Sequence, residues 1–163
     1  MTGTQAEPTT SHLPTMRWAL GGSGWADWHW SPGETKLKVT ASYIGPEILA
    51  TFMNAVQDLV SGSRSAFVTF FDEPGGTRVF FNRKDDQLFV QIVEFDHLHE
   101  PITWWQGARL LWADRVPVSV FADAFVTMIE QLLAEYGTDG YRKHWGHDFP
   151  ATDWAALQMA HRA

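Results

Sequence analysis

Two histidines in the middle of the chain have the spacing of a metal-binding pair. His97 and His99 are separated by a single residue. On a strand, residues two positions apart point to the same side, where both imidazoles can bind one zinc or iron ion. A third ligand would come from the C-terminal part of the chain, from His144, His147 or Asp148. The pair lies in an expected loop after an apolar strand, however, and metal ligands need rigid support. We therefore expect no metal ion and no other cofactor.

Nucleophilic catalysis has no recognisable motif in this sequence. The Gly-x-Ser-x-Gly turn that presents a catalytic serine is absent, and segment 21–24 contains only a fragment of it. No Gly-Lys-Ser/Thr follows these glycines, so they do not predict a phosphate-binding loop. The chain has no cysteine and hence no thiol nucleophile. The carboxylate pairs at 72–73 and 85–86 fall in expected turns, where Asp is common for conformational reasons. We expect a protein that is not an enzyme.

Aromatic residues are unusually frequent, at 14% of the chain, and nine of them are Trp. Large aromatic side chains dominate hydrophobic cores, so the core is the expected place for most of them. The alternative is a pocket lined by Trp and His, which would make the protein a small-molecule-binding domain or an enzyme. The residues of this alternative pocket are Trp25, Trp28, Trp30, His97, His99, His144 and Trp145.

The charge balance is acidic and excludes several classes of partner. The 163 residues include 12 Lys and Arg against 19 Asp and Glu, giving a formal net charge of -7. Nucleic acid is an unfavourable partner for such a chain, because phosphates are bound by clustered cations. No run of 18 apolar residues predicts a membrane span, and the N-terminus does not resemble a signal peptide. We therefore expect a cytoplasmic protein that binds neither nucleic acid nor membrane.

Hydrophobic periodicity predicts that an α+β fold positions the candidate site residues. Residues 1–14 are rich in Thr, Ser and Pro and read as a disordered tail, followed by a single domain over 15–163. Strands are expected at 15–20, 36–43, 66–71, 77–82, 88–95 and 108–113, with an aromatic loop or irregular strand near 25–30. Helices are expected from 46 to 61, from 117 to 136 and, briefly, from 152 to 159. This order predicts one antiparallel sheet of about six strands, including a central meander, with two main helices on one face.

The longest predicted helix has a wholly acidic polar side. Asp123, Glu130 and Glu135 lie opposite its apolar residues, and no Lys or Arg occurs between residues 115 and 142. A solvated helix ordinarily carries Glu–Lys pairs at i, i+4, which also support the helix. An acidic solubility surface explains the pattern, and so does a binding surface for a basic partner.

The sequences of several turns and helix ends resemble those of a known group of proteins. The pattern begins with Glu73-Pro74-Gly75-Gly76 at a hairpin, followed by Arg78, Phe80 and Arg83 and then by Val90, Ile92 and Phe95. It continues with the Val116-Pro117 helix start, the run Leu133-Ala134-Glu135-Tyr136-Gly137, and Gly140-Tyr141 with Trp145. Over about residues 65–150 this pattern resembles small bacterial immunity proteins of polymorphic toxin systems.

The resemblance implies a compact α+β protein that blocks one cognate toxin by tight binding and has no catalysis of its own. The acidic helix would then face a basic toxin domain, and charge would speed their association. Trp104 and Trp105 are the expected energetic centre of that contact, because Trp is enriched in binding hot spots.

Overall fold

The computed structural model describes residues 12–98 and 107–163. Within these ranges the chain forms seven strands and three helices. The strands are β1 (Thr15–Gly22), β2 (Trp25–Ser31), β3 (Leu37–Ser42), β4 (Ser65–Asp72), β5 (Gly75–Lys84), β6 (Gln87–Phe95) and β7 (Arg109–Pro117). The helices are α1 (Ile48–Val60), α2 (Val118–Trp145) and α3 (Ala151–Arg162).

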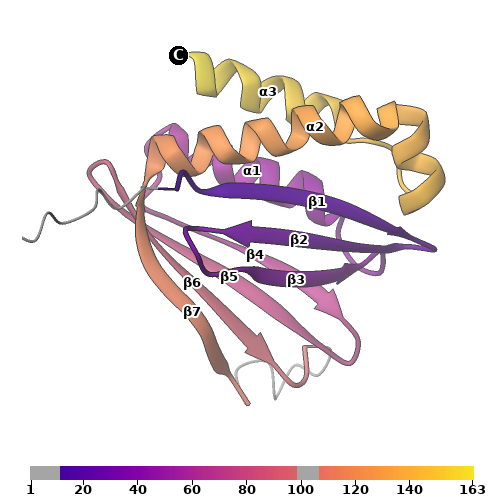
Figure 1. Cartoon of the computed structure of the whole chain (residues 1–163), viewed down its shortest axis with the longest axis horizontal. Helices are drawn as coiled ribbons and strands as arrows, with labels where there is room; N and C mark the ends of the chain where they lie inside the picture. Colours follow the sequence, from indigo (N-terminus) through magenta and orange to yellow (C-terminus); the bar gives the residue numbers. More distant parts are fainter. Residues whose placement is uncertain (1–11, 99–106) are drawn as a thin grey trace, which may run out of the picture.

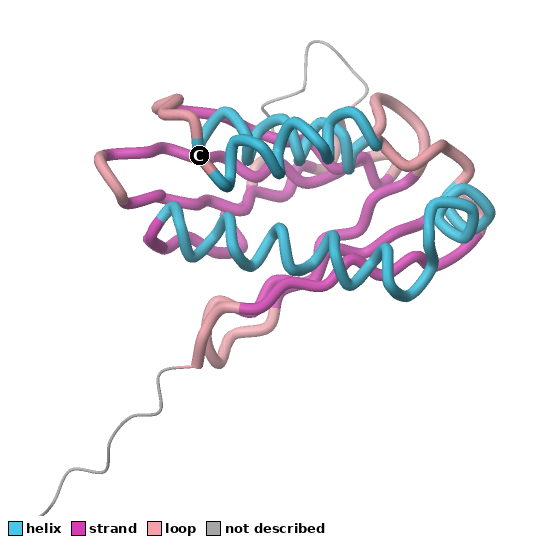
Figure 2. Tube along the Cα trace, turned by 90° about the horizontal axis from the view of Figure 1, so that it is seen from above, coloured by secondary structure: helices cyan, strands magenta, loops and turns pink. Residues whose placement is uncertain are grey.

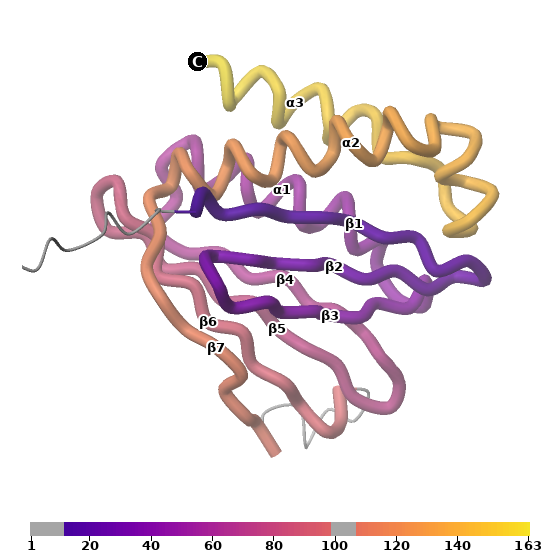
Figure 3. The backbone as a smooth tube through the Cα atoms, viewed as in Figure 1, coloured from indigo at the N-terminus to yellow at the C-terminus, as the bar shows by residue number. Residues whose placement is uncertain are grey.

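The strands form two antiparallel sheets, one of order β1-β2-β3 and one of order β4-β5-β6-β7 (Figure 1). Each sheet is a meander of strands that are neighbours in sequence, as the tube in Figure 3 traces. The predicted α+β class with antiparallel strands is confirmed, but the single sheet of about six strands is wrong. The additional strand is β2, which pairs regularly with both of its neighbours. Helix α1 follows β3, so β4 begins a second sheet instead of closing a hairpin with β3.

One aromatic core lies between the two sheets. Trp28 of β2 is fully buried and stacks on Phe70 of β4 at a centroid distance of 5.9 Å. Its edge also meets Phe52 of α1 at 5.1 Å, and Phe52 in turn lies 4.6 Å from Phe125 of α2. Aromatic rings therefore join both sheets and two helices, and the tryptophans of the N-terminal sheet serve mainly as core residues.

The helices gather on one side of the molecule, as the view from above in Figure 2 shows. Helix α2 packs along β1, α1 packs along β4, and α3 packs on α1. We expected the main helix to end at Gly137, but it resumes after this residue and runs to Trp145. Gly137 has φ 65° and ψ 179°, a conformation that breaks the helical path without ending the element. None of the helices in the described part of the chain is long and apolar enough to cross a membrane.

Candidate interaction surface

The outer side of α2 presents the three carboxylates that the helical period predicts. One side of the helix is buried and comprises Phe121, Phe125, Met128 and Leu132. The residues on the opposite side of the helix face outward. Asp123, Glu130 and Glu135, which we call the acidic face of α2, are all exposed. The helix therefore divides into a core side and a charged side, as expected for an amphipathic helix on a folded domain.

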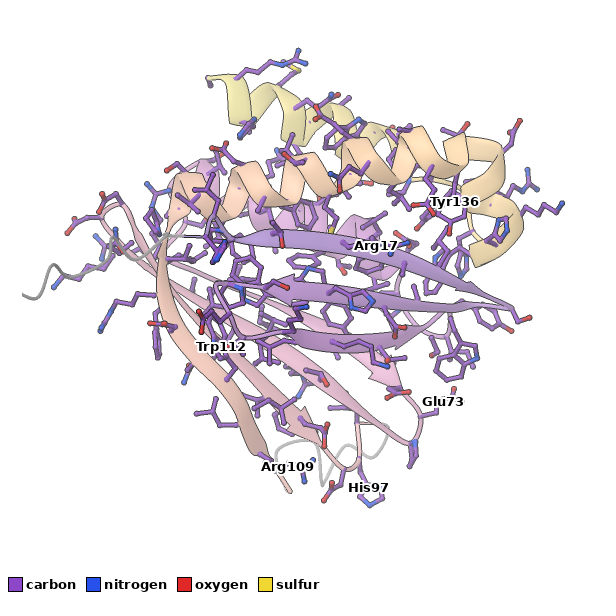
Figure 4. The ribbon with its side chains drawn as sticks, in the orientation of Figure 1. Arg17, Glu73, His97, Arg109, Trp112 and Tyr136 are labelled. Atoms are coloured by element: carbon purple, nitrogen blue, oxygen red, sulfur yellow. The ribbon has the colours of Figure 1, made fainter. Side chains whose placement is uncertain are left out.

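Basic side chains from other elements reduce the charge of this face. Asp123 Oδ1 lies 2.6 Å from Nε2 of His161 in α3. Arg17 of β1 lies 3.8 Å from Glu135, and Figure 4 shows Arg17 on the strand beside α2. Among the described residues Glu130 has no ion pair within 4.0 Å. The sequence could not reveal these partners, because tertiary packing brings them to α2, Arg17 from β1 at the start of the chain and His161 from the end of α3.

A groove of about 370 Å³ runs between α2 and α3 next to this face. Asp123 and Glu130 lie on its α2 side, and His161 and Arg162 lie on its α3 side. Both signs of charge therefore line the groove. Its geometry suits polar contacts with a partner surface better than the burial of an apolar ligand.

The predicted aromatic anchors Trp104 and Trp105 lie outside the described residues, and so does His99. His97 is exposed on the segment that follows β6, close to the position of Arg109 in Figure 4. In the described part of the chain, no group of three or more His, Cys, Asp or Glu side chains could hold a metal ion.

The residues of the alternative Trp/His pocket are spread over different parts of the fold. Trp28 and Trp30 are fully buried core residues, whereas Trp25 is 41% exposed. His144 packs beside Tyr136 with a ring distance of 5.1 Å, and Figure 4 shows Tyr136 far from His97. The five cavities that we describe are lined by other residues. Among the described members of this set, Trp28 and Trp30 belong to the core rather than to a pocket.

One cavity of about 500 Å³ lies between α1 and the first strands of the C-terminal sheet. Phe67 and Phe80 form its apolar wall, and Thr51 and Asn54 of α1 form a polar one. Asp58 is the single titratable side chain in its lining. A lone carboxylate supplies no acid–base pair among the lining residues of this cavity.

A polar cluster that the sequence analysis missed joins the start of α1 to the end of α2. Glu47 is the N-cap of α1, and its Oε2 accepts a hydrogen bond from the amide of Ala50 at 2.6 Å. Its Oε1 accepts hydrogen bonds from the Tyr141 hydroxyl at 2.9 Å and from Trp145 Nε1 at 3.0 Å. Burial, and then the charge of Glu47, raise the pKa of Tyr141. The only sequence signal was a Glu at a helix start, and nothing linked it to residues almost 100 positions later.

Comparisons of the chain with protein-family models, with curated proteins and with solved structures found no match.

Proposed function

We propose that this protein is a non-enzymatic binding protein of the immunity type, which neutralises a basic toxin by covering it. The observation that carries the proposal is the exposed acidic face of α2, on a helix whose other side is fixed in the core. Such a surface is rigid, because the packing of Phe121 and Phe125 holds the helix in place. It can therefore present its carboxylates to a partner without rearrangement.

Charge supports the same partner class. The whole chain carries a formal net charge of -7, and the electric field of this net charge attracts a basic protein before the two come into contact. Glu135 lies in the last turn before the break at Gly137, where the helix dipole disfavours an anion by about 0.3–1 kcal/mol. An unfavourable placement of this kind is consistent with a role in binding rather than in folding.

The test replaces Asp123, Glu130 and Glu135 together by Lys and measures association with the protein encoded by the adjacent gene. The association rate should fall at low salt, and the difference from the wild type should shrink as ionic strength rises and screens the field. Each of these side chains is exposed, so the variant should stay folded, with a loss of about 1 kcal/mol or less per ion pair.

A matched control replaces Glu34, Asp58 and Asp114 by Lys, which gives the same change in net charge on other parts of the surface. If both variants slow association equally, only the total charge matters, and the acidic face of α2 is not the contact. If the wild-type protein neither binds the neighbouring product nor protects cells that produce it, the proposed function is wrong.

A further inference from the structure

A second surface gathers exposed aromatic side chains at one end of the molecule. Trp25, Tyr43 and Ile44, which we call the aromatic end, are 41%, 49% and 45% exposed. Trp25 opens β2 and pairs with Ser42, the last residue of β3, so the three residues lie at the same end of the N-terminal sheet. Isolated exposed apolar residues are ordinary, but a group of large ones marks an interaction surface.

Tyr43 is exposed and yet held in position from two sides. Its amide donates a hydrogen bond to the carbonyl oxygen of Gly24 at 2.8 Å, and its ring lies directly on this glycine. His147, from the connection between α2 and α3, lies 3.1 Å from the Tyr43 carbonyl oxygen, and the two rings are 5.9 Å apart. Binding through this ring therefore costs little conformational entropy, which is the property of an effective anchor.

Two carboxylates, Asp27 and Asp72, belong to strands that reach this end of the molecule. Asp27 is two residues after Trp25 on the same side of β2, and its Oδ1 accepts a hydrogen bond from Thr40 at 2.6 Å. Asp72 ends β4, and Figures 1 and 3 show the β4–β5 turn toward the same end as the β1–β2 turn. Burial, and then the charges of Asp27 and Glu94, raise the pKa of Asp72, whereas Lys38 acts in the opposite direction. Negative charge therefore prevails around Asp72.

The neighbouring positive charges do not cancel this potential. Arg142 precedes His147 along the chain, and its guanidinium lies 3.4 Å from Asp148, so these two residues largely compensate each other. Lys38 lowers the pKa of Asp72, and Arg109 is ion-paired with Glu94. These two positive charges stand against the three carboxylates Asp27, Asp72 and Glu94, so they compensate only part of the negative charge.

Aromatic faces next to carboxylates fit one type of side chain best. The guanidinium of arginine is planar, stacks on aromatic rings and pairs with carboxylates, and it is weakly hydrated compared with an ammonium group. We propose that the aromatic end is the contact surface for an arginine-bearing segment of the basic protein partner. The inference rests on the proposed function, and it assigns the energetic centre of binding to a part of the fold distant in sequence from α2.

The first experiment titrates the ¹⁵N-labelled protein with a deca-arginine peptide at low salt and follows the tryptophan indole N–H signals. Trp25 is the exposed tryptophan of this surface, so its signal should shift, while those of the buried Trp28 and Trp30 should not. Shifts confined to the backbone of α2 around Glu130 would overturn the inference and leave the proposed function standing. The absence of any binding would also overturn it.

The second experiment compares Tyr43→Ala and Asp27→Asn with two controls, Phe67→Ala and Asp114→Asn. Phe67 is a 58% exposed aromatic on the other sheet, and Asp114 is an exposed carboxylate of β7. Tyr43→Ala and Asp27→Asn should each weaken peptide binding by about fivefold, and each control should weaken it by less than about twofold. Equal effects in both pairs would overturn the inference. Asp72→Asn provides a second charge variant if Asp27→Asn melts at a lower temperature than the wild type.

The neighbouring-gene product then separates the two proposals. If it binds the wild-type protein and Tyr43→Ala with equal affinity, the proposed function stands and the aromatic end is not its contact. If it fails to bind the wild type, the proposed function fails, and the inference that rests on it fails too.

Discussion

Glu47 shows how one side chain can hold two distant parts of the chain together. Its carboxylate caps α1 and accepts hydrogen bonds from Tyr141 and Trp145, both of which are almost fully buried. A buried donor that loses its acceptor costs about 1–3 kcal/mol, and a lost N-cap costs about 1 kcal/mol.

Glu47→Ala should therefore lower the free energy of unfolding by about 3 kcal/mol or more, as measured by urea denaturation. Glu47→Gln retains an acceptor oxygen and should lose less. Glu34→Ala, at an exposed position, serves as the control and should change little. Equal losses for Glu47→Ala and Glu34→Ala would contradict the contacts of this carboxylate.

Tyr141 should make the free energy of unfolding decrease at alkaline pH. Its folded-state pKa is raised by burial and by Glu47, whereas an unfolded tyrosine ionises near pH 10. Above about pH 10 the unfolded chain loses this proton and the folded protein keeps it, so stability falls by about 1.4 kcal/mol per pH unit from this residue. Below pH 10 the contribution is fully present.

The measurement is urea denaturation between pH 8 and 11. Tyr141→Phe should be less stable at pH 8, because it lacks the hydrogen bond, but its stability should fall less steeply above pH 10. Tyr43→Phe, at an exposed tyrosine, should keep the slope of the wild type. If Tyr141→Phe also keeps that slope, the hydroxyl is not protected from ionisation in the folded state.

At the scale of elements, the β1–β2 turn depends on a glycine that the sequence alone did not single out. Gly24 has φ +80°, and a Cβ at this position would lie 2.2 Å from the Tyr43 ring. Gly24→Ala should therefore destabilise the protein by at least about 1–2 kcal/mol, through the left-handed backbone and the displaced ring.

Gly33→Ala is the matched control, because Gly33 has no left-handed backbone and a Cβ there meets no atom within 4 Å. Thermal unfolding of the two variants tests the difference. A Gly24→Ala variant as stable as Gly33→Ala would show that the Tyr43 ring is free to move away.

The elements were predictable to the extent that their residues follow a local period. The alternation of the strands and the three- and four-residue spacing of α1 and α2 predicted most elements and the exposed side of α2. β2 was ambiguous, because a strand with Trp at three of its seven positions resembles an irregular aromatic loop. The hydrogen bond between Asp123 and His161 and the ion pair between Glu135 and Arg17 could not be predicted, since tertiary packing alone brings these residues together.

Several residues of the resemblance motif have structural reasons to be present. A Cβ at Gly75 would lie 2.3 Å from the Phe95 carbonyl oxygen, and one at Gly76 would lie 2.2 Å from that of Phe70. Arg83 donates from its guanidinium to the Leu59 carbonyl oxygen at the end of α1, a helix that has no basic residue in its last turn. These three residues of the motif therefore serve the packing of the hairpin and of the end of α1.

At the scale of the whole molecule, the two sheets share one core, so they should unfold together. Trp28 contacts Phe70 of the other sheet and Phe52 of α1. Trp28→Ala should cost about 3–5 kcal/mol, a range typical of large aromatic residues replaced in a core. Trp25→Ala, at a half-exposed tryptophan, should cost much less.

Far-UV circular dichroism and tryptophan fluorescence of the wild-type protein should report the same denaturation midpoint. Two separate transitions would show that each sheet is stable without the other. The division into two sheets was not predictable from the sequence, because it depends on where α1 directs the chain after β3 rather than on the pattern of any strand.

The two meanders also have a consequence for the protein during its synthesis. Every strand pair joins consecutive strands, so the N-terminal sheet can form as soon as residue 42 has left the ribosome. Its inner tryptophans acquire their partners only later, when Phe52, Phe70 and Phe121 have been made. The nascent chain thus carries a tryptophan-rich face without its hydrophobic cover until α1, β4 and α2 have been translated.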